Sequence, residues 1–289
     1  MKQRFCELHI PVKQKEAVMH LLSWNVAGRL KKCNQQLELV RNRNPDIVAL
    51  QEVRPSSYNL LHAGLDEIGL EHIIESVSLA THFNRRFGEL IASRYPQQKL
   101  PATDIDIPYP ERVLSANIST PWGMVELHTT HIPPGSSNGW IKIETLEGIY
   151  RRLACASKIP RILCGDFNTP QAEFSDGTVV TWGQSVNSER IIKLVRNYER
   201  WDAGERNILI GLAKYDLPDI FRMLHGYGVQ NYSWRVMRKG REIARRRFDH
   251  IFASSQLNPI ECKYLHAFRN SGASDHSAIE ARFEPMSLI

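Results

Sequence analysis

Residues 20–50 read HLLSWNVAGRLKKCNQQLELVRNRNPDIVAL and decide the fold of this chain. Two apolar runs, HLLSWNV at residues 20–26 and DIVAL at residues 46–50, have the length and composition of buried β-strands. Residues 34–43, which lie between them, predict a short helix. A strand, a helix and a strand in succession indicate an α/β protein, in which helices cover the faces of a sheet.

The same alternation continues through the rest of the chain. Further strands are predicted at residues 89–93, 113–119, 124–131, 161–164, 232–236, 248–253 and 278–283. Residues 140–157 predict a helix because Ile143, Leu146 and Ile149 recur at helical spacing, and residues 188–200 and 217–225 are also expected to be helical. Strands that first pair locally and then alternate with helices predict a layered α/β sandwich.

The length and the apolar content suit one large domain. A chain of 289 residues, of which 42% are hydrophobic, can build one sizeable core. Because no repeat or linker is visible, residues 1–289 are interpreted as a single domain with an N-terminal extension over about residues 1–19. Residues 183–216 are charged and less periodic, and they are interpreted as a surface insertion that carries a helix. A substrate-reading insertion is the alternative.

Charge and cysteine content narrow the class of protein. Lys and Arg outnumber Asp and Glu by 37 to 31, and the net charge of +6 favours anionic partners such as nucleic acid. Five cysteines without a CxxC pair argue against a disulfide framework and against a zinc cluster. No apolar stretch predicts a secretory signal or a transmembrane helix, so we expect a cytoplasmic protein. Nothing in the sequence indicates an obligate protein partner.

Polar side chains that suit metal binding and acid–base chemistry follow the apolar runs. A rigid strand end is a common place for a functional group. The candidates, with their contexts, are Asn25 (SWNVAG), Glu52 (ALQEV), His131 (HTTHIPPGSSNGW), Asp166 and Asn168 (ILCGDFNTP), Asp249 (RRRFDHIF), and Asp275 and His276 (SGASDHSAIEARF). Each of these signals is weak alone, since a lone Asp after a strand is usually a turn residue. The ordered set is far more specific.

The series WNVAG, PDIVALQEV, GDFN, RFDHIF and SDHSAI resembles the signature motifs of the endonuclease/exonuclease/phosphatase superfamily, and it covers residues 24–279. That superfamily includes exonuclease III, the abasic-site endonucleases, deoxyribonuclease I, neutral sphingomyelinases and inositol polyphosphate 5-phosphatases. The resemblance implies a four-layer α/β sandwich with two packed mixed β-sheets flanked by helices. It also implies a single catalytic domain that hydrolyses phosphoric esters with Mg²⁺, or alternatively Mn²⁺.

The resemblance also implies roles for individual residues. Glu52 resembles the principal metal ligand of the family, with Asn25 and Asp275 nearby. Asp166 resembles the residue that orients or deprotonates the attacking water, and Asn168 the one that contacts the phosphate. Hard oxygen ligands of this kind suit Mg²⁺, which keeps several of its waters.

Three further residues resemble the phosphate-binding groups of the family. Asp249 and His276 resemble its Asp–His pair, in which the carboxylate orients the imidazole. His131 stands where many members carry a phosphate-binding or proton-donating His and where exonuclease III-like members carry a Tyr. The prolines that follow it, Pro133 and Pro134, are exonuclease-like, so the motif mixes two subfamilies.

Several features bear on which ester is the substrate. The basic run at residues 235–247 includes Arg245, Arg246 and Arg247 and predicts a patch that tracks a phosphate backbone, with a solvated hairpin as the alternative. Trp234 and Phe248 are candidates for stacking on bases, although core packing is the more frequent fate of such residues. Residues 219–235 (DIFRMLHGYGVQNYSWR) also resemble exonuclease III-like enzymes.

Two positions depart from the pattern of abasic endonucleases. Ala27 replaces an Asp, and Arg246 replaces an aromatic residue of the abasic pocket. The leading hypothesis is a DNA nuclease of the exonuclease III or abasic-endonuclease kind, with a role in DNA repair. One alternative is an enzyme that acts on RNA or on a lipid or small phosphoester. A second is a non-catalytic nucleic-acid-binding protein with the same fold.

Overall fold

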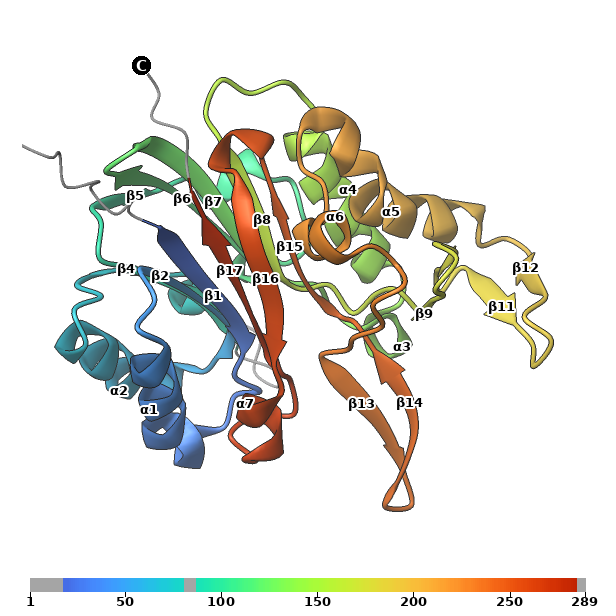
Figure 1. Ribbon diagram of the computed structural model, residues 1–289, viewed down its shortest axis with the longest axis horizontal. Coiled ribbons are helices and arrows are strands. Elements are labelled where there is room, and N and C mark those ends of the chain that lie inside the picture. Colours follow the sequence, from blue (N-terminus) through green and yellow to red (C-terminus); the bar gives the residue numbers. More distant parts are fainter. Residues whose placement is uncertain (1–17, 81–86, 285–289) are drawn as a thin grey trace, which may run out of the picture.

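The computed structural model describes residues 18–80 and 87–284, which contain two mixed β-sheets (Figure 1). The first has the strand order β16 (Pro259–Leu265), β17 (Ala278–Phe283), β1 (Met19–Asn25), β2 (Ile47–Val53), β4 (Gly88–Ser93) and β3 (His72–Glu75). The second has the order β15 (Asp249–Ala253), β8 (Arg161–Asp166), β7 (Gly123–His131), β6 (Val113–Thr120) and β5 (Gln97–Lys99). β1 pairs with β2 in parallel, and so does β7 with β8, while the other neighbours are antiparallel.

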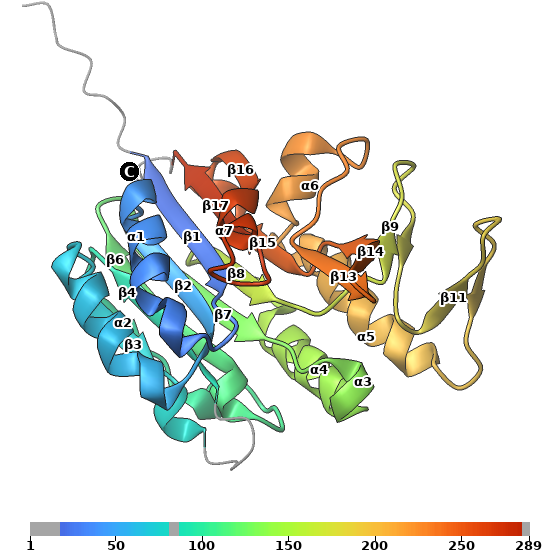
Figure 2. The ribbon, with the colours of Figure 1, turned by 90° about the horizontal axis from the view of Figure 1, so that it is seen from below.

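Helices cover the outer face of each sheet, as Figure 2 shows. α1 (Cys33–Arg43), α2 (Pro55–Glu67) and α7 (His266–Asn270) lie on the first sheet, and α4 (Ile141–Leu153) and α5 (Glu199–Leu209) lie on the second. Three hydrophobic clusters, one between the sheets and one under each helical layer, fill the spaces between these layers. The structure therefore confirms the expected four-layer sandwich.

The remaining elements are short. They are α3 (Gly135–Asn138), α6 (Ile220–His225), the strand pairs β9 (Ala172–Glu173) with β10 (Val179–Val180), β11 (Gln184–Val186) with β12 (Ile192–Leu194) and β13 (Trp234–Arg238) with β14 (Arg241–Arg246), and the 3₁₀ turns Leu30–Lys32, Val77–Leu79, Ala102–Asp104, Pro110–Arg112, Gly211–Tyr215 and Ser255–Leu257. The hairpins β11–β12 and β13–β14 project from the body of the sandwich (Figure 1). Among the described residues, no helix combines the length and the apolar character needed to cross a membrane.

The continuous apolar runs of the sequence reflect burial on both faces of each sheet. Successive side chains of a strand point to opposite faces. In β1, Leu21 packs between the two sheets, whereas Leu22 and Trp24 pack under the helices of the first sheet. In β8, Ile162 faces the space between the sheets and Leu163 faces α4. A strand covered on both sides is mostly apolar on both faces, which is why these runs do not alternate between apolar and polar residues.

The structure differs from the sequence-based prediction in two helices and at the N-terminal extension. The predicted helix at residues 188–200 is wrong, because residues 192–194 form β12 and the helix there, α5, spans Glu199–Leu209. Asn187 stabilises a hairpin turn at this point, because its Oδ1 accepts hydrogen bonds from the backbone N–H groups of Glu189 and Ile191. The helix predicted at residues 140–157 ends at Leu153. Of the expected N-terminal extension, residues 1–17 lie outside the described residues, and Met19 already belongs to β1.

Candidate active site

Sheet pairing brings polar residues that are distant in the sequence to one edge of the sandwich. In the second sheet, Asp166 at the end of β8 is the register partner of His131 on β7 and of Asp249 on β15. Register partners carry their side chains on the same face of a sheet. In the first sheet, Asn25 at the end of β1 lies beside the end of β2, which carries Glu52. The ends of both sheets therefore supply the site.

Backbone conformation at these ends is unusual. Ala27, Glu52 and Asn168 have φ values of 55°, 58° and 50°, in the left-handed region that few residues other than glycine adopt. Glu52 lies where the pairing of β2 with β4 shifts register, and such a bulge re-aims a side chain. At Gly165 a Cβ atom would lie 2.0 Å from the Thr130 carbonyl oxygen, so only glycine lets β8 approach β7 beside Asp166. Strained backbone is typical of functional sites.

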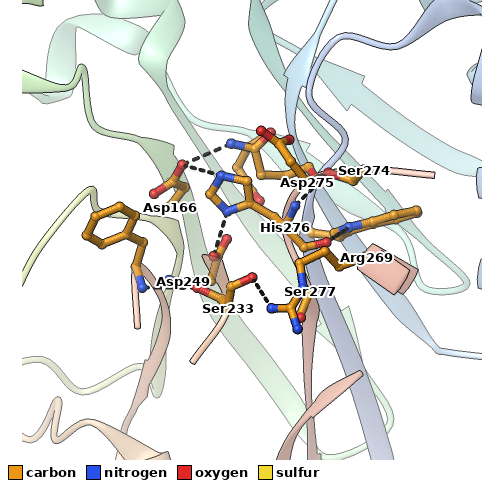
Figure 3. Close-up of polar contacts among 12 residues, drawn as sticks. Asp166, Ser233, Asp249, Arg269, Ser274, Asp275, His276 and Ser277 are labelled. Carbon is orange, nitrogen blue, oxygen red and sulfur yellow. Dashed lines mark hydrogen bonds and ion pairs between the residues drawn. The ribbon is translucent and has the colours of Figure 1, made fainter. Parts of the chain in front are cut away.

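His276 lies between two carboxylates (Figure 3). Its Nδ1 lies 2.8 Å from Asp249 Oδ2, and its Nε2 lies 3.7 Å from Asp166 Oδ2. Burial alone would lower the pKa of His276, but the negative charges of Asp249 and Asp166 outweigh it and raise that pKa to about 10. The imidazole is therefore a cation at neutral pH, with both ring nitrogens protonated.

The loop that carries His276 is tied to the first strand. Ser274 Oγ donates to the Asn25 carbonyl at 2.6 Å and accepts the backbone N–H of His276 at 3.1 Å. The indole N–H of Trp24 donates to the carbonyl of His276 at 3.1 Å. On the other side, Ser233 Oγ accepts the backbone N–H of Asp249 at 3.1 Å. These contacts hold the imidazole and its carboxylate partner in fixed orientations.

Asn25 bridges the two carboxylates that face the site. Its Nδ2 donates to Glu52 Oε1 at 3.0 Å and to Asp166 Oδ2 at 2.9 Å, while its Oδ1 accepts the backbone N–H of Ala27 at 2.9 Å. The amide nitrogen of Asn25, and not its oxygen, therefore faces Glu52. Burial raises the pKa of Asp166 to about 7 against the attraction of the His276 cation, and the charges of Asp249 and Glu52 act in the same direction as burial.

His131 has the opposite character to His276. Arg112 Nη1 lies 2.6 Å from His131 Nδ1, and a guanidinium has only donors, so Nδ1 accepts and the proton of the neutral ring lies on Nε2. Nε2 lies 3.4 Å from Glu52 Oε1 and 3.9 Å from Asp166 Oδ2. Burial and the charges of Arg112 and His276 hold the pKa of His131 well below its usual range. His131 is therefore a neutral hydrogen-bond donor.

These groups line a pocket of about 790 Å³. Glu52, His131, Asp166, Asn168 and His276 form its polar wall. Asn168 is held in place by donation of its Nδ2 to the carbonyl of Ile132 at 2.9 Å. The pocket therefore offers two carboxylates, one cationic imidazole and one neutral imidazole to the same ligand.

The donor set fits a divalent cation that prefers oxygen ligands. Two clusters have the spacing of metal ligands, Glu52 with His131 and Asp166, and Asp166 with Asp249 and His276. Nδ1 of His131 accepts from Arg112 and Nδ1 of His276 faces the Asp249 carboxylate, so these two nitrogens already have partners. The carboxylate oxygens of Glu52 and Asp166 remain, and their mutual repulsion would be relieved by a cation. Oxygen-only coordination is characteristic of Mg²⁺ and Mn²⁺.

Of the three predicted metal ligands, Glu52 lies in this cluster, Asn25 turns its amide nitrogen toward it, and Asp275 lies outside it. The carboxylate of Asp275 is half exposed and lies 3.7 Å from Arg29, which is consistent with an ordinary surface ion pair. It belongs to neither of the two clusters formed by the other acidic residues and histidines. Although Asp275 precedes His276 directly, it is not among the residues that line the pocket.

The three consecutive arginines have three different surroundings. Arg245 pairs with Glu242 at 2.5 Å and lies over the ring of Tyr232. Arg246 lines the pocket. Arg247 is buried and pairs with Glu173 at 2.6 Å and with Asp219 at 2.8 Å, so it stabilises the interior and does not face the pocket.

The predicted aromatic residues lie together. Trp234 and Phe248 line the pocket and stack with ring centroids 5.5 Å apart. Arg112, Ser233 and Ser274, which position the candidate residues, were missed from the sequence. Arg112 and Ser233 act on residues 19 and 16 positions away, and Ser274 binds the carbonyl of Asn25 in a distant strand as well as the nearby backbone N–H of His276. Long-range contacts of this kind leave no local pattern in the sequence.

The sequence and the structure were compared with known proteins. A model of the Endonuclease/Exonuclease/phosphatase family matches residues 22–276, and a search of curated proteins found no match. An AP endonuclease from Archaeoglobus fulgidus has a similar structure, with a TM-score of 0.67, 20% identity and coverage of 92% of this chain and 99% of that one.

Two other solved structures are similar. One is the 3′ phosphatase NExo from Neisseria bound to a product DNA hairpin, with a TM-score of 0.63, 22% identity and coverage of 92% and 99%. The other is D. rerio TDP2 complexed with a single-strand DNA product, with a TM-score of 0.62, 17% identity and the same coverage. At such identities these likenesses show the fold alone. The family model, however, spans nearly the whole chain, and this protein therefore belongs to the Endonuclease/Exonuclease/phosphatase family.

Proposed function

We propose that this protein is a divalent-metal-dependent phosphodiester hydrolase that cleaves DNA, of the exonuclease III or abasic-endonuclease kind. The observation that carries the proposal is the pairing of two unlike imidazoles across two carboxylates. His276 is a cation beside Asp166, and His131 is a neutral donor beside Glu52. A phosphoryl group between them would meet donors on both sides, as stabilisation of its charge requires.

The proposed roles follow from the surroundings of each group. Asp166 accepts a proton from the attacking water, and Asn25 holds its carboxylate toward the pocket. His276, oriented by Asp249, donates to one phosphoryl oxygen, and His131 donates to another from Nε2. Asn168 lines the same pocket, and its proposed role is to contact the phosphate.

Glu52 would be the principal ligand of the metal, with Asp166 nearby. A bound Mg²⁺ or Mn²⁺ would neutralise charge on the phosphoryl oxygens and stabilise the leaving oxygen. Asn25 supports Glu52 through its Nδ2 donor, and Asp275, which lies 3.7 Å from Arg29, is proposed as a further acidic residue near the metal.

Two observations favour nucleic acid as the substrate. The chain carries a net charge of +6, and Arg246 adds a cation to the pocket, while the hairpin β13–β14 presents further arginines beside it. Two structurally similar proteins, NExo and TDP2, were solved with DNA product. Cationic surfaces beside a phosphate site supply most of the affinity for a nucleic-acid backbone.

His131 also supports a second candidate. Members of the superfamily that hydrolyse lipid or small phosphoesters carry a His at this position, so a phosphodiesterase acting on such a substrate or on RNA is the alternative function. The volume of the pocket, about 790 Å³, is compatible with a small ligand.

The test uses end-labelled DNA duplexes, one intact and one with a single abasic site, incubated with Mg²⁺, with Mn²⁺ or with EDTA. The control is Asp166→Asn, which keeps the shape of the side chain and removes the proton acceptor. Metal-dependent cleavage that the variant lowers by roughly 10²-fold or more supports the proposal, and the product pattern separates incision from end degradation. Cleavage of RNA or of a small diester, with intact DNA in every lane, would favour the second candidate.

A further inference from the structure

A wall of aromatic side chains faces the polar wall of the pocket. Trp182, Tyr198 and Trp201 line the cavity, and the last two come from the segment that the sequence predicts as a surface insertion, residues 183–216. Trp201 packs against Tyr198 with ring centroids 5.5 Å apart and against Trp140 at 5.3 Å. Trp182 and Tyr198 retain 37% and 38% of their exposure, so their rings are open to a ligand.

One buried carboxylate connects these aromatic residues to the loop that follows Asn168. Glu205 on α5 has no exposed surface. Its Oε1 accepts from Trp201 Nε1 at 2.9 Å and from Lys142 Nζ at 2.5 Å. Its Oε2 accepts the backbone N–H of Trp182 at 2.8 Å and the hydroxyl of Thr169 at 2.7 Å. Four contacts to one carboxylate join α4, α5, Trp182 and the loop after Asn168 into a single rigid unit.

Trp182 is also tied directly to a candidate phosphate-binding residue. Its indole Nε1 donates to the carbonyl of Asn168 at 3.0 Å, and Lys142 Nζ donates to the same carbonyl at 3.0 Å. The edge of the indole is therefore fixed next to the phosphate position. Two cations also lie over the Trp182 ring, the guanidinium of Arg246 at 5.8 Å from the ring centroid and Nζ of Lys142 at 6.0 Å.

This arrangement suits a ligand with a phosphate at one end and a planar ring near it. Rigid aromatic side chains bind planar rings by stacking. The indole N–H of Trp182 is already used within the protein, so a ligand can meet this ring only at its exposed surface. Arg246 complements the charge of an attached phosphate.

We infer that Trp182 and Tyr198, supported from behind by the buried Trp201, form a base-stacking subsite, which binds an unpaired nucleobase of the nucleotide next to the scissile phosphate. The inference rests on the proposed function, since it assigns the substrate of that same pocket. A base inside a duplex is already paired and stacked on both faces, so it reaches this wall only when it is unpaired. The subsite therefore favours single-stranded segments and open ends over continuous duplex.

The test compares two ligands that differ only in the base, thymidine 5′-monophosphate and 2-deoxyribose 5-phosphate. Binding to the full chain is measured by calorimetry in Mg²⁺. We expect the nucleotide to bind about tenfold to a hundredfold more tightly than the sugar phosphate, as stacking on one or two rings implies. Trp182→Ala should abolish most of this ratio, whereas Trp182→Phe, which keeps an aromatic face and lacks the indole N–H, should retain most of it.

Trp122→Ala is the matched control, because Trp122 lies beside Tyr95 at the β6–β7 turn and outside the pocket. Equal affinities of the wild-type protein for the two ligands would overturn the inference, and so would an unchanged ratio in a folded Trp182→Ala. The experiment needs no hydrolysis. A base-dependent ratio without DNA cleavage would refute the proposed function alone, whereas cleavage that requires Asp166 without such a ratio would refute the subsite alone.

Discussion

Arg112 Nη1 donates to Nδ1 of His131 across 2.6 Å in the buried floor of the pocket. Because the guanidinium cannot accept a hydrogen bond, this contact determines the tautomer of the imidazole. It directs the ring proton to Nε2, toward Glu52 and Asp166. Two histidines of one pocket thus receive opposite partners, a guanidinium at His131 and a carboxylate at His276, and hence opposite charge states.

We expect Arg112→Ala to lower kcat by roughly 10²-fold with a smaller change in KM, because loss of the guanidinium frees the ring to adopt the wrong tautomer. Arg112→Lys retains a donor and should restore part of the rate. Steady-state kinetics on a DNA substrate with saturating Mg²⁺ measures both. If Arg112→Ala lowered only the melting temperature and left kcat intact, Arg112 would be structural and not a positioning residue.

Glu52→Gln should require a higher Mg²⁺ concentration for half-maximal activity, since the neutral amide loses the charge that attracts the cation. Asp275→Asn provides the matched control. It changes a half-exposed carboxylate paired with Arg29, and its Mg²⁺ titration should overlay that of the wild-type protein. Equal displacement of both curves would place Asp275 among the metal ligands.

Arg246 and Arg247 are neighbours with different expected phenotypes. Arg246→Ala should reduce the slope of log Kd against log salt by about one, because it removes one cation from the pocket wall. Arg247→Ala should instead destabilise the fold by roughly 3–5 kcal/mol, because it leaves the buried carboxylates of Glu173 and Asp219 without their partner. Binding at several salt concentrations and urea unfolding separate the two effects. A stable Arg247→Ala protein would contradict the assigned role.

The Glu173 carboxylate should make stability depend on acid pH. Burial opposes ionisation, but Arg247 and Arg222 outweigh it and lower the pKa of Glu173 from about 4.5 to about 2. A depressed pKa contributes stability that is fully present above about pH 4.5 and is lost as the pH falls through about 2. The depression corresponds to roughly 3 kcal/mol.

Urea unfolding at several pH values between 2 and 6 is the measurement for this carboxylate. Glu173→Gln should be less stable than the wild-type protein at pH 6, and the difference should shrink as the pH falls toward about 2. The exposed Glu189→Gln is the control and should show no such dependence. A difference that stays constant across the whole range would show that ionisation of Glu173 contributes nothing to stability.

Many of the central strands and helices could be predicted from the hydrophobic pattern of neighbouring residues. The apolar runs at residues 20–26 and 46–50 became β1 and β2, and the helix between them became α1. These elements follow from burial on both faces of a strand and from the period of a helix, which neighbouring residues encode. The prediction failed at residues 188–200, where the side chain of Asn187 turns the chain into a hairpin that hydrophobic periodicity does not reveal.

The sequence by itself determined the α/β class, many of the central strands, the family and which polar residues stand at strand ends. Only the tertiary structure decided where those side chains point. Asp275 and His276 are adjacent, yet one pairs with Arg29 at the surface and the other lies between Asp166 and Asp249. Side-chain direction depends on strand register and on partners from distant segments, and neither is written in the local pattern of residues.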